Sequence, residues 1–200
     1  KRQVLIFSPH PDDDVISMGG TFARLVEQGH DVHVAYETSG NIAVLDDYIY
    51  QQMDIAAAFT HLVGGDTQTM DAAFEKVKQI IADRKPEDDE PEELLPFKGA
   101  LRRAEARGAD RYLGIPEDHV HFLNLPFYET GSVKKKPLSQ ADIDIIVKLL
   151  REVQPHQIYA AGDLADPHGT HGVCLDAILK AYDIVCEDEW FKNCYTWWYR

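Results

Sequence analysis

Short apolar runs alternate with longer amphipathic stretches over the first part of the chain. The run at residues 4–7 is apolar and partly β-branched, which predicts a fully buried strand. Residues 15–28 carry apolar side chains at helical spacing and stop at Gly29, so they predict a helix. Residues 31–37 predict a second strand. A strand, a helix and a strand in this order are typical of a parallel sheet covered by helices.

The same alternation continues to the C-terminus. The chain has 200 residues, a size at which folding buries roughly 70% of the unfolded surface, and neither a repeat nor a linker divides it. We therefore expect one α/β domain over residues 1–200, with a Rossmann-like, mostly parallel sheet flanked by helices in three layers. The further elements expected are helices at 45–59, 70–82, 98–113, 143–153 and 172–185, strands at 120–125 and 157–160, and a strand or interface at 190–199.

Acidic residues outnumber basic ones, 34 to 20, for a net charge of −14. Such a chain repels phosphate backbones and anionic lipids, and no apolar run approaches the roughly 18 residues of a spanning helix, so we expect no nucleic acid or membrane partner. The three cysteines form no C-x-x-C pair, which favours a reducing, cytoplasmic location. Because the chain begins with Lys1 and ends after an aromatic run, we expect it to belong to a longer protein.

Two segments with reactive side chains follow predicted strands. Residues 8–14 contain a histidine and three consecutive carboxylates. Residues 163–171 follow the strand at 157–160 and read Asp-Leu-Ala-Asp-Pro-His-Gly-Thr-His. Both segments lead into helices. Ligands of open α/β sheets collect at the carboxyl ends of the strands, so the two turns can converge on one site.

The spacing within both segments suits a metal ion. Three adjacent acids repel one another, and a helix N-terminus supplies only about half a positive charge. His10 and Asp13 stand three residues apart, as do His168 and His171, and two histidines with one aspartate are a common catalytic zinc set. Taken singly, each segment has a simpler interpretation: a proline-bearing turn with Asp as the helix N-cap, and histidines of a surface loop.

At these residues the chain resembles the LmbE-like (PIG-L) family of zinc-dependent N-deacetylases. Residues 9–14 read Pro-His-Pro-Asp-Asp-Asp, which matches the opening signature of the family. Residues 38–40 read Thr-Ser-Gly where the family often has Thr-Asn-Gly, and residues 102–114 keep its Arg-x-x-Glu spacing before Leu-Gly. Residues 168–171 read His-Gly-Thr-His where the family usually has His-Pro-Asp-His. The landmarks run from residue 4 to about 180.

The resemblance implies a role for each residue of the two turns. His10, Asp13 and His171 are implied to bind one zinc ion per chain. Asp12 is implied to be the general base that accepts a proton from zinc-bound water. His168 is implied to steady the oxyanion and to protonate the leaving amine.

Further positions follow from the resemblance or depart from it. Arg102 is implied to contact a substrate oxygen. Thr170 stands where the family has an aspartate. We expect the negative charge that this aspartate lends to the histidine acid to come from another residue, with Asp163 and Asp166 as candidates. Gly169 stands where the family has a proline, which we expect to loosen the loop.

Several segments lie outside these motifs. An insertion relative to the family, roughly residues 45–97, is expected to reshape the substrate cleft, and it contains an acidic, proline-bearing and solvated loop at 83–97. The three lysines at 134–136 are expected in a solvated loop, at a place that suits a flap over a site. Gly19 and Gly20 are expected to permit close approach of the first helix to the sheet.

The other histidines carry weaker signals. His119 and His121 share a strand face and could chelate a metal, although an exposed strand edge is the simpler interpretation. We expect the remaining four in turns or at the surface: His30, His33, His61 and His156. Cys174 is expected at a core position of the last helix.

The resemblance implies a zinc-dependent hydrolase that removes an acetyl group from an N-acetylated amino sugar, such as N-acetylglucosamine, or from a sugar conjugate. A small-molecule substrate, fusion to another amino-sugar enzyme and a homo-oligomer are compatible with it. Two alternatives stay open. A metal-dependent phosphoesterase is disfavoured by the acidic charge and by the lack of a Gly-rich phosphate loop. A non-catalytic metal- or carbohydrate-binding module would be marked by loss of Asp12, which is present.

Overall fold

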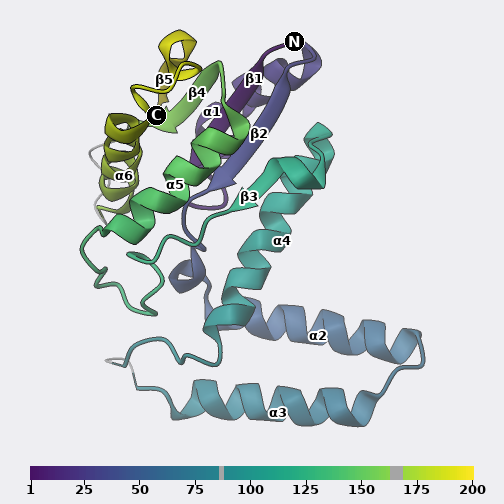
Figure 1. Ribbon diagram of the computed structural model, residues 1–200. Helices are drawn as coiled ribbons and strands as arrows, with labels where there is room; N and C mark the ends of the chain where they lie inside the picture. Colours follow the sequence, from purple (N-terminus) through teal and green to yellow (C-terminus); the bar gives the residue numbers. More distant parts are fainter. Residues whose placement is uncertain (86–87, 163–168) are drawn as a thin grey trace. The chain divides into compact units, whose positions relative to one another are not determined.

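The computed structural model describes residues 1–85, 88–162 and 169–200 (Figure 1). Its helices and strands correspond to those that the hydrophobic pattern predicts. In chain order they are β1 (Gln3–Ser8), α1 (Asp13–Glu27), β2 (Asp31–Tyr36), η1 (Asn41–Ala43), α2 (Asp46–Leu62), α3 (Thr67–Asp83), α4 (Leu95–Leu113), η2 (Glu117–His119), β3 (Val120–Phe122), α5 (Gln140–Val153), β4 (Gln157–Ala161), α6 (Thr170–Val185), η3 (Phe191–Asn193) and β5 (Tyr195–Tyr199).

The five strands form one parallel sheet in the order β3-β2-β1-β4-β5. Val4 at the centre pairs with Val32 on one side and with Gln157 on the other. The chain first moves outward from β1 to β3 and then returns to add β4 on the opposite side of β1. The predicted α/β class is therefore confirmed, and the order reverses between β1 and β4, which is where such sheets bind ligands.

Strand β1 is buried on both faces, as its unbroken apolar run predicts. Val4 and Ile6 pack with Met18 and Phe22 of α1 on one face of the sheet. Helices α5 and α6 pack against each other and lie on the opposite face (Figure 1). Because helices pack on both faces of the sheet, the carboxyl ends of β1 and β4 are held in fixed positions.

The chain divides into two compact units. The first contains residues 1–39, 103–130 and 134–200 and includes the whole sheet. The second contains residues 40–102 and 131–133, which covers the predicted insertion at 45–97. Helices α2 and α3 contact each other in it, around a small core of buried apolar side chains: Val44, Ile49, Met53 and Leu94.

The acidic segment of the second unit is more than the solvated loop that its composition predicts. Its last residues, 95–97, already belong to α4. Lys98 is buried, and its Nζ lies 2.6 Å from Glu90 Oε2 and 3.4 Å from Asp46 Oδ1. Arg84 pairs with the same two carboxylates. A buried ammonium needs such partners, so Glu90 is a structural counter-ion.

The glycines of α1 do not mark a close approach of that helix to the sheet, contrary to the expectation from the sequence. A Cβ built at Gly20 has no described atom within 4 Å, and one at Gly19 meets only Val15 Cβ, at 3.9 Å. Helix α1 is instead irregular just before them, because Met18 has φ −137° and ψ 17°.

Replacing Gly20 by Ala is therefore expected to stabilise the protein by about 0.5–1 kcal/mol, because the site is helical and has room for a methyl group. Gly29→Ala is the matched control: Gly29 ends the same helix at φ +75°, where an L side chain is strained. Urea unfolding measures both variants. Equal destabilisation by the two substitutions would show that Gly20 has a packing role.

The aromatic C-terminal segment forms the edge strand β5, so the strand interpretation of residues 190–199 is confirmed for residues 195–199. Trp197 and Trp198 remain 55% and 51% exposed there. Among the helices that the structure describes, none has the length and apolar character needed to cross a membrane.

Candidate metal centre

The turn after β1 folds its acidic side chains back toward the sheet. The backbone N–H of Asp12 donates to the carbonyl oxygen of His10 at 2.8 Å, and the N–H of His10 donates to Asp13 Oδ2, also at 2.8 Å. These two bonds close a tight loop around Pro11. The carboxylate of Asp13 is thereby held beside the ring of His10, as the three-residue spacing predicts.

The third acid of the turn, Asp14, has a different environment. It is buried, and its two carboxylate oxygens lie 3.1 Å from Ser8 Oγ and 3.1 Å from the Tyr36 hydroxyl. Tyr36 is also 3.1 Å from Asp110. Burial raises the pKa of Asp14 to about 6 and that of Asp110 to about 7. The hydroxyl groups of Ser8 and Tyr36 therefore stabilise the Asp14 carboxylate, and the argument that all three acids need a cation is wrong for this residue.

The second turn is set by a glycine in a left-handed conformation. Gly169 has φ +71° and occupies the N-cap position of α6, directly before Thr170 and His171. Proline, whose φ is fixed near −65°, cannot adopt this conformation. Gly169 therefore gives α6 an entry that a proline at this position could not adopt.

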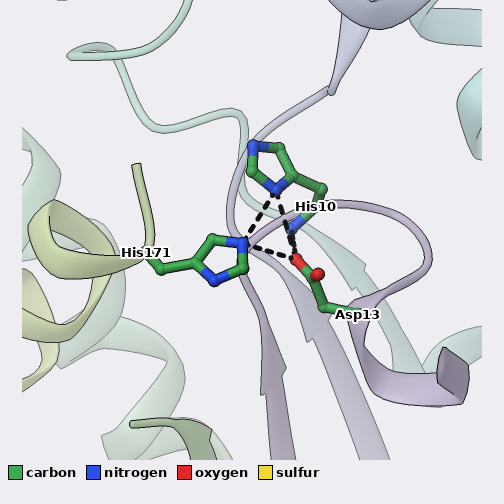
Figure 2. Close-up of side chains that lie close together, drawn as sticks. All are labelled: His10, Asp13 and His171. Carbon is green, nitrogen blue, oxygen red and sulfur yellow. Dashed lines mark hydrogen bonds and ion pairs between the residues drawn. The ribbon is translucent and has the colours of Figure 1, made fainter. Parts of the chain in front are cut away.

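Three side chains from the two turns meet at one point (Figure 2). His171 Nε2 lies 3.3 Å from His10 Nδ1 and 3.2 Å from Asp13 Oδ2, and His10 Nδ1 lies 3.2 Å from the same Asp13 oxygen. The side chains are 17–23% exposed, so the cluster is shielded but reachable. The convergence of the two strand-end turns, predicted from the sequence, is thus observed.

The donor set fits a zinc ion. Tetrahedral donors at about 2.0–2.1 Å from one ion are separated by roughly 3.3–3.4 Å, which is close to the three spacings of the cluster. Burial alone would raise the pKa of Asp13, but hydrogen bonds and charge interactions with His10 and His171 outweigh it and hold that pKa well below its usual range. An ionised carboxylate with two imidazoles can replace part of the water shell of a divalent cation.

Asp12 lies next to this cluster at the start of α1. It occupies the N-cap position and is partly exposed, and its side chain makes no capping hydrogen bond among the residues that the structure describes. The alternative interpretation of the turn, with this carboxylate as a helix cap, is thus not observed. Within the described residues, the helix therefore begins without a hydrogen bond from its first turn to the Asp12 carboxylate.

Two side chains near the cluster, Tyr128 and Glu37, had no role in the sequence analysis. Tyr128 is buried with its ring edge-on to His10, 5.7 Å between centroids, and Lys135 Nζ lies 3.6 Å from the centre of the Tyr128 ring. The lysine segment therefore comes close to the site, as the flap interpretation suggested. Glu37 is fully buried, and this raises its pKa to about 8, although the Cys174 thiol and His171 favour its charged form.

Position along the sheet could have identified Glu37, because it directly follows β2 just as the His10 turn follows β1. Thr38 confirms this proximity, since its hydroxyl donates to the carbonyl oxygen of Pro9 at 2.7 Å. Glu129 then accepts from the N–H and hydroxyl of Ser39 at 3.0 and 2.9 Å. The Thr-Ser-Gly motif at 38–40 thus connects the first turn to the Tyr128 segment.

The structure says less of the remaining candidates. His168, Asp163 and Asp166 are outside the described residues. Arg102 lies on α4 in the second compact unit, and its substrate contact stays a prediction. Cys174 is buried in α6 and forms no disulfide with a described cysteine, so its core assignment is confirmed.

Solved structures with a similar fold come from several enzymes. The hydratase GalB from Pseudomonas putida KT2440 has a TM-score of 0.57 and 20% identity, covering 95% of this chain and 59% of that one. The N,N'-diacetylchitobiose deacetylase from Pyrococcus horikoshii has a TM-score of 0.50 and 21% identity, covering 92% and 55%. A deacetylase of teicoplanin biosynthesis has a TM-score of 0.53 and 19% identity, covering 96% and 64%. At these identities the likeness shows the fold.

A closer relative is found in Bacteroides thetaiotaomicron, with the name "Putative glucosamine-6-phosphate deaminase-like protein". It is 51% identical over 202 residues, which cover all of this chain and 30% of the relative. The chain therefore spans about 30% of the length of that protein. The family model described as "PIG-L: GlcNAc-PI de-N-acetylase" matches residues 5–182, and the chain belongs to this family.

Proposed function

We propose that this chain is a zinc-dependent N-deacetylase that releases acetate from an N-acetylated amino sugar or sugar conjugate. The observation that carries the proposal is the triangle of His10, Asp13 and His171 at the point where the strand order reverses, with Asp12 adjacent to Asp13 in the same turn. Membership of the PIG-L family supports amide hydrolysis as the reaction.

His10, Asp13 and His171 would hold the ion. When bound, zinc supplies a Lewis acid that polarises the acetyl carbonyl and brings the pKa of a bound water to about 7. The protein fixes the donor positions before binding: Asp13 accepts the N–H of His10, and Gly169 sets the entry of α6 that carries His171.

Asp12 is proposed to accept the proton of the attacking water. Its neighbour Asp13 is engaged by both histidines, so the two adjacent carboxylates have separate tasks. His168 is proposed to protonate the leaving amine and to steady the oxyanion, and Arg102 to contact a substrate oxygen. Both roles rest on the family motif.

The substrate class follows from the site and the relatives together. Tyr128 places an aromatic ring next to His10 and the Lys135 ammonium group lies over that ring, which suits a small polar ligand such as a sugar. Two neighbours of similar fold are named as deacetylases of diacetylchitobiose and of the teicoplanin pathway. The name of the closer relative contains glucosamine-6-phosphate, and the length of that relative supports fusion to a further amino-sugar enzyme domain.

Acetate release tests the proposal directly. The protein is incubated with a panel of N-acetyl sugars, with a phosphate monoester in parallel, and its zinc content is recorded. Acetate release that requires zinc supports the deacetylase. Phosphate release would favour the phosphoesterase, and full acetate release by zinc-free protein would contradict the metal role. Zinc binding without turnover on any substrate would favour the non-catalytic module.

A further inference from the structure

A second group of metal-binding side chains lies at the other end of the sheet. Asp31 and His33 stand at the amino end of β2, while His119 and His121 lie on the segment that enters β3. The carboxyl ends of the parallel strands, which carry the His10 turn, are at the opposite end. Residues two apart on a strand share a face, so the two pairs Asp-x-His and His-x-His form a four-cornered patch across adjacent strands.

The side chains of this patch contact one another. The rings of His33 and His119 stack with centroids 3.9 Å apart and planes 13° apart. His33 Nδ1 lies 3.1 Å from His121 Nε2, and His119 Nδ1 lies 3.2 Å from the carbonyl oxygen of Val32. His119 and His121 do lie at a sheet edge, since β3 is the outermost strand, but they are half-buried and not exposed, and His33 is gathered with them on β2 and not in a turn.

We propose that Asp31, His33 and His119 form a second binding site for a divalent first-row cation with affinity for imidazole, such as Zn²⁺. One donor atom from each of the three lies within 4.8 Å of the others. Two imidazoles and one carboxylate are a donor set that such ions prefer. This site is separate from the catalytic proposal and does not depend on it.

The contacts of the patch determine which ring nitrogen of each histidine can bind a metal. His119 Nδ1 is the ring nitrogen that faces the carboxylate, 3.7 Å from Asp31 Oδ1, while the contact of His33 Nδ1 with His121 leaves Nε2 of His33 as its nitrogen for a metal. Since the two rings are nearly parallel, one has to turn about its Cβ–Cγ bond to bring an ion into both ring planes, and this torsion is broad for histidine.

Charge around the patch favours a bound cation over protons. Burial and the nearby His119 and His121 lower the pKa of His33 to about 4, so its ring is neutral at pH 7. Asp31, Asp118 and Glu152 act on these histidines in the opposite direction, because their charges favour a positive group. A cation bound by neutral imidazoles suits both effects, because the buried rings stay unprotonated and the nearby carboxylates gain a positive partner. Lys1, 3.6 Å from Asp31 on the exposed side, is the cation it would displace.

The test measures metal stoichiometry by equilibrium dialysis against Zn²⁺ followed by metal analysis. We expect two equivalents for the wild-type chain, one for H171A, one for H33A or H119A, and none for H33A/H171A. Acetate release by H33A should stay within about twofold of wild type. H156A, which removes an exposed histidine, is the control and should keep two equivalents. Loss of both equivalents in H171A, or retention of both in H33A and H119A, overturns the proposal.

A measurement without substitution of the patch keeps the test valid if H33A and H119A unfold. In H171A, Ni²⁺ is titrated while the histidine ring signals are followed by NMR. Selective broadening of the His33 and His119 rings at substoichiometric Ni²⁺ supports the site. Uniform broadening across all histidines, or broadening elsewhere first, contradicts it.

Discussion

Replacing His171 by Ala is expected to lower the zinc affinity of the His10 cluster by more than about 100-fold and to abolish acetate release. The substitution removes one of three donors, and even the loss of an outer partner of a metal ligand commonly costs about 10- to 100-fold in affinity. The two remaining donors, His10 Nδ1 and Asp13 Oδ2, are 3.2 Å apart and belong to one turn, so they cannot enclose an ion. Metal analysis after dialysis and an acetate assay give the two readouts.

The control for His171→Ala is His156→Ala, which removes an exposed imidazole from the loop before β4. Circular dichroism establishes that both variants fold. The wild-type stoichiometry should fall by one equivalent in His171→Ala and stay unchanged in His156→Ala. Unchanged zinc content and activity in folded His171→Ala would remove this residue from the site.

The second large effect is expected from Asp12→Asn, which keeps the shape of the side chain but removes its basicity. Turnover should fall by about 10²- to 10⁴-fold, the usual contribution of a positioned general base, while zinc content stays at the wild-type level. Turnover and zinc content should respond differently because Asp13 is the carboxylate in contact with both His10 and His171. Initial rates of acetate release, with zinc content measured on the same samples, test it.

Asp183→Asn removes a carboxylate from an exposed position of α6 and serves as the matched control for charge. Its activity should equal that of the wild type. Near-normal turnover in Asp12→Asn would show that another group accepts the proton. Loss of zinc together with turnover would instead make Asp12 part of the metal-binding set.

The strand ends and the metal cluster could be predicted because each depends on local rules. The run at residues 4–7 is apolar enough to be a central strand, and a parallel sheet then brings its carboxyl end beside that of β4. The three-residue spacing of His10 and Asp13 needs only one turn of backbone to bring them together.

Other features depend on contacts between distant segments, which a single sequence does not display. The hydrogen bond to Asp14 requires the hydroxyl of Tyr36, and the ion pair of Lys98 requires Asp46. The register of β2 against β3 places His33 beside His119, although each alone resembles a surface residue. The left-handed conformation of Gly169 likewise follows from where α6 must begin.

The metal cluster also has a consequence for the order of folding. His10 and His171 are 161 residues apart, so the triangle is incomplete until the last third of the chain has added β4 beside β1 and started α6. A nascent chain that ends before residue 170 presents only the two donors of the first turn. With the proposed zinc site, tight metal uptake would therefore be a late event, and the bound ion would stabilise the closed chain by about 4 kcal/mol when its free concentration is about 1,000 times the dissociation constant.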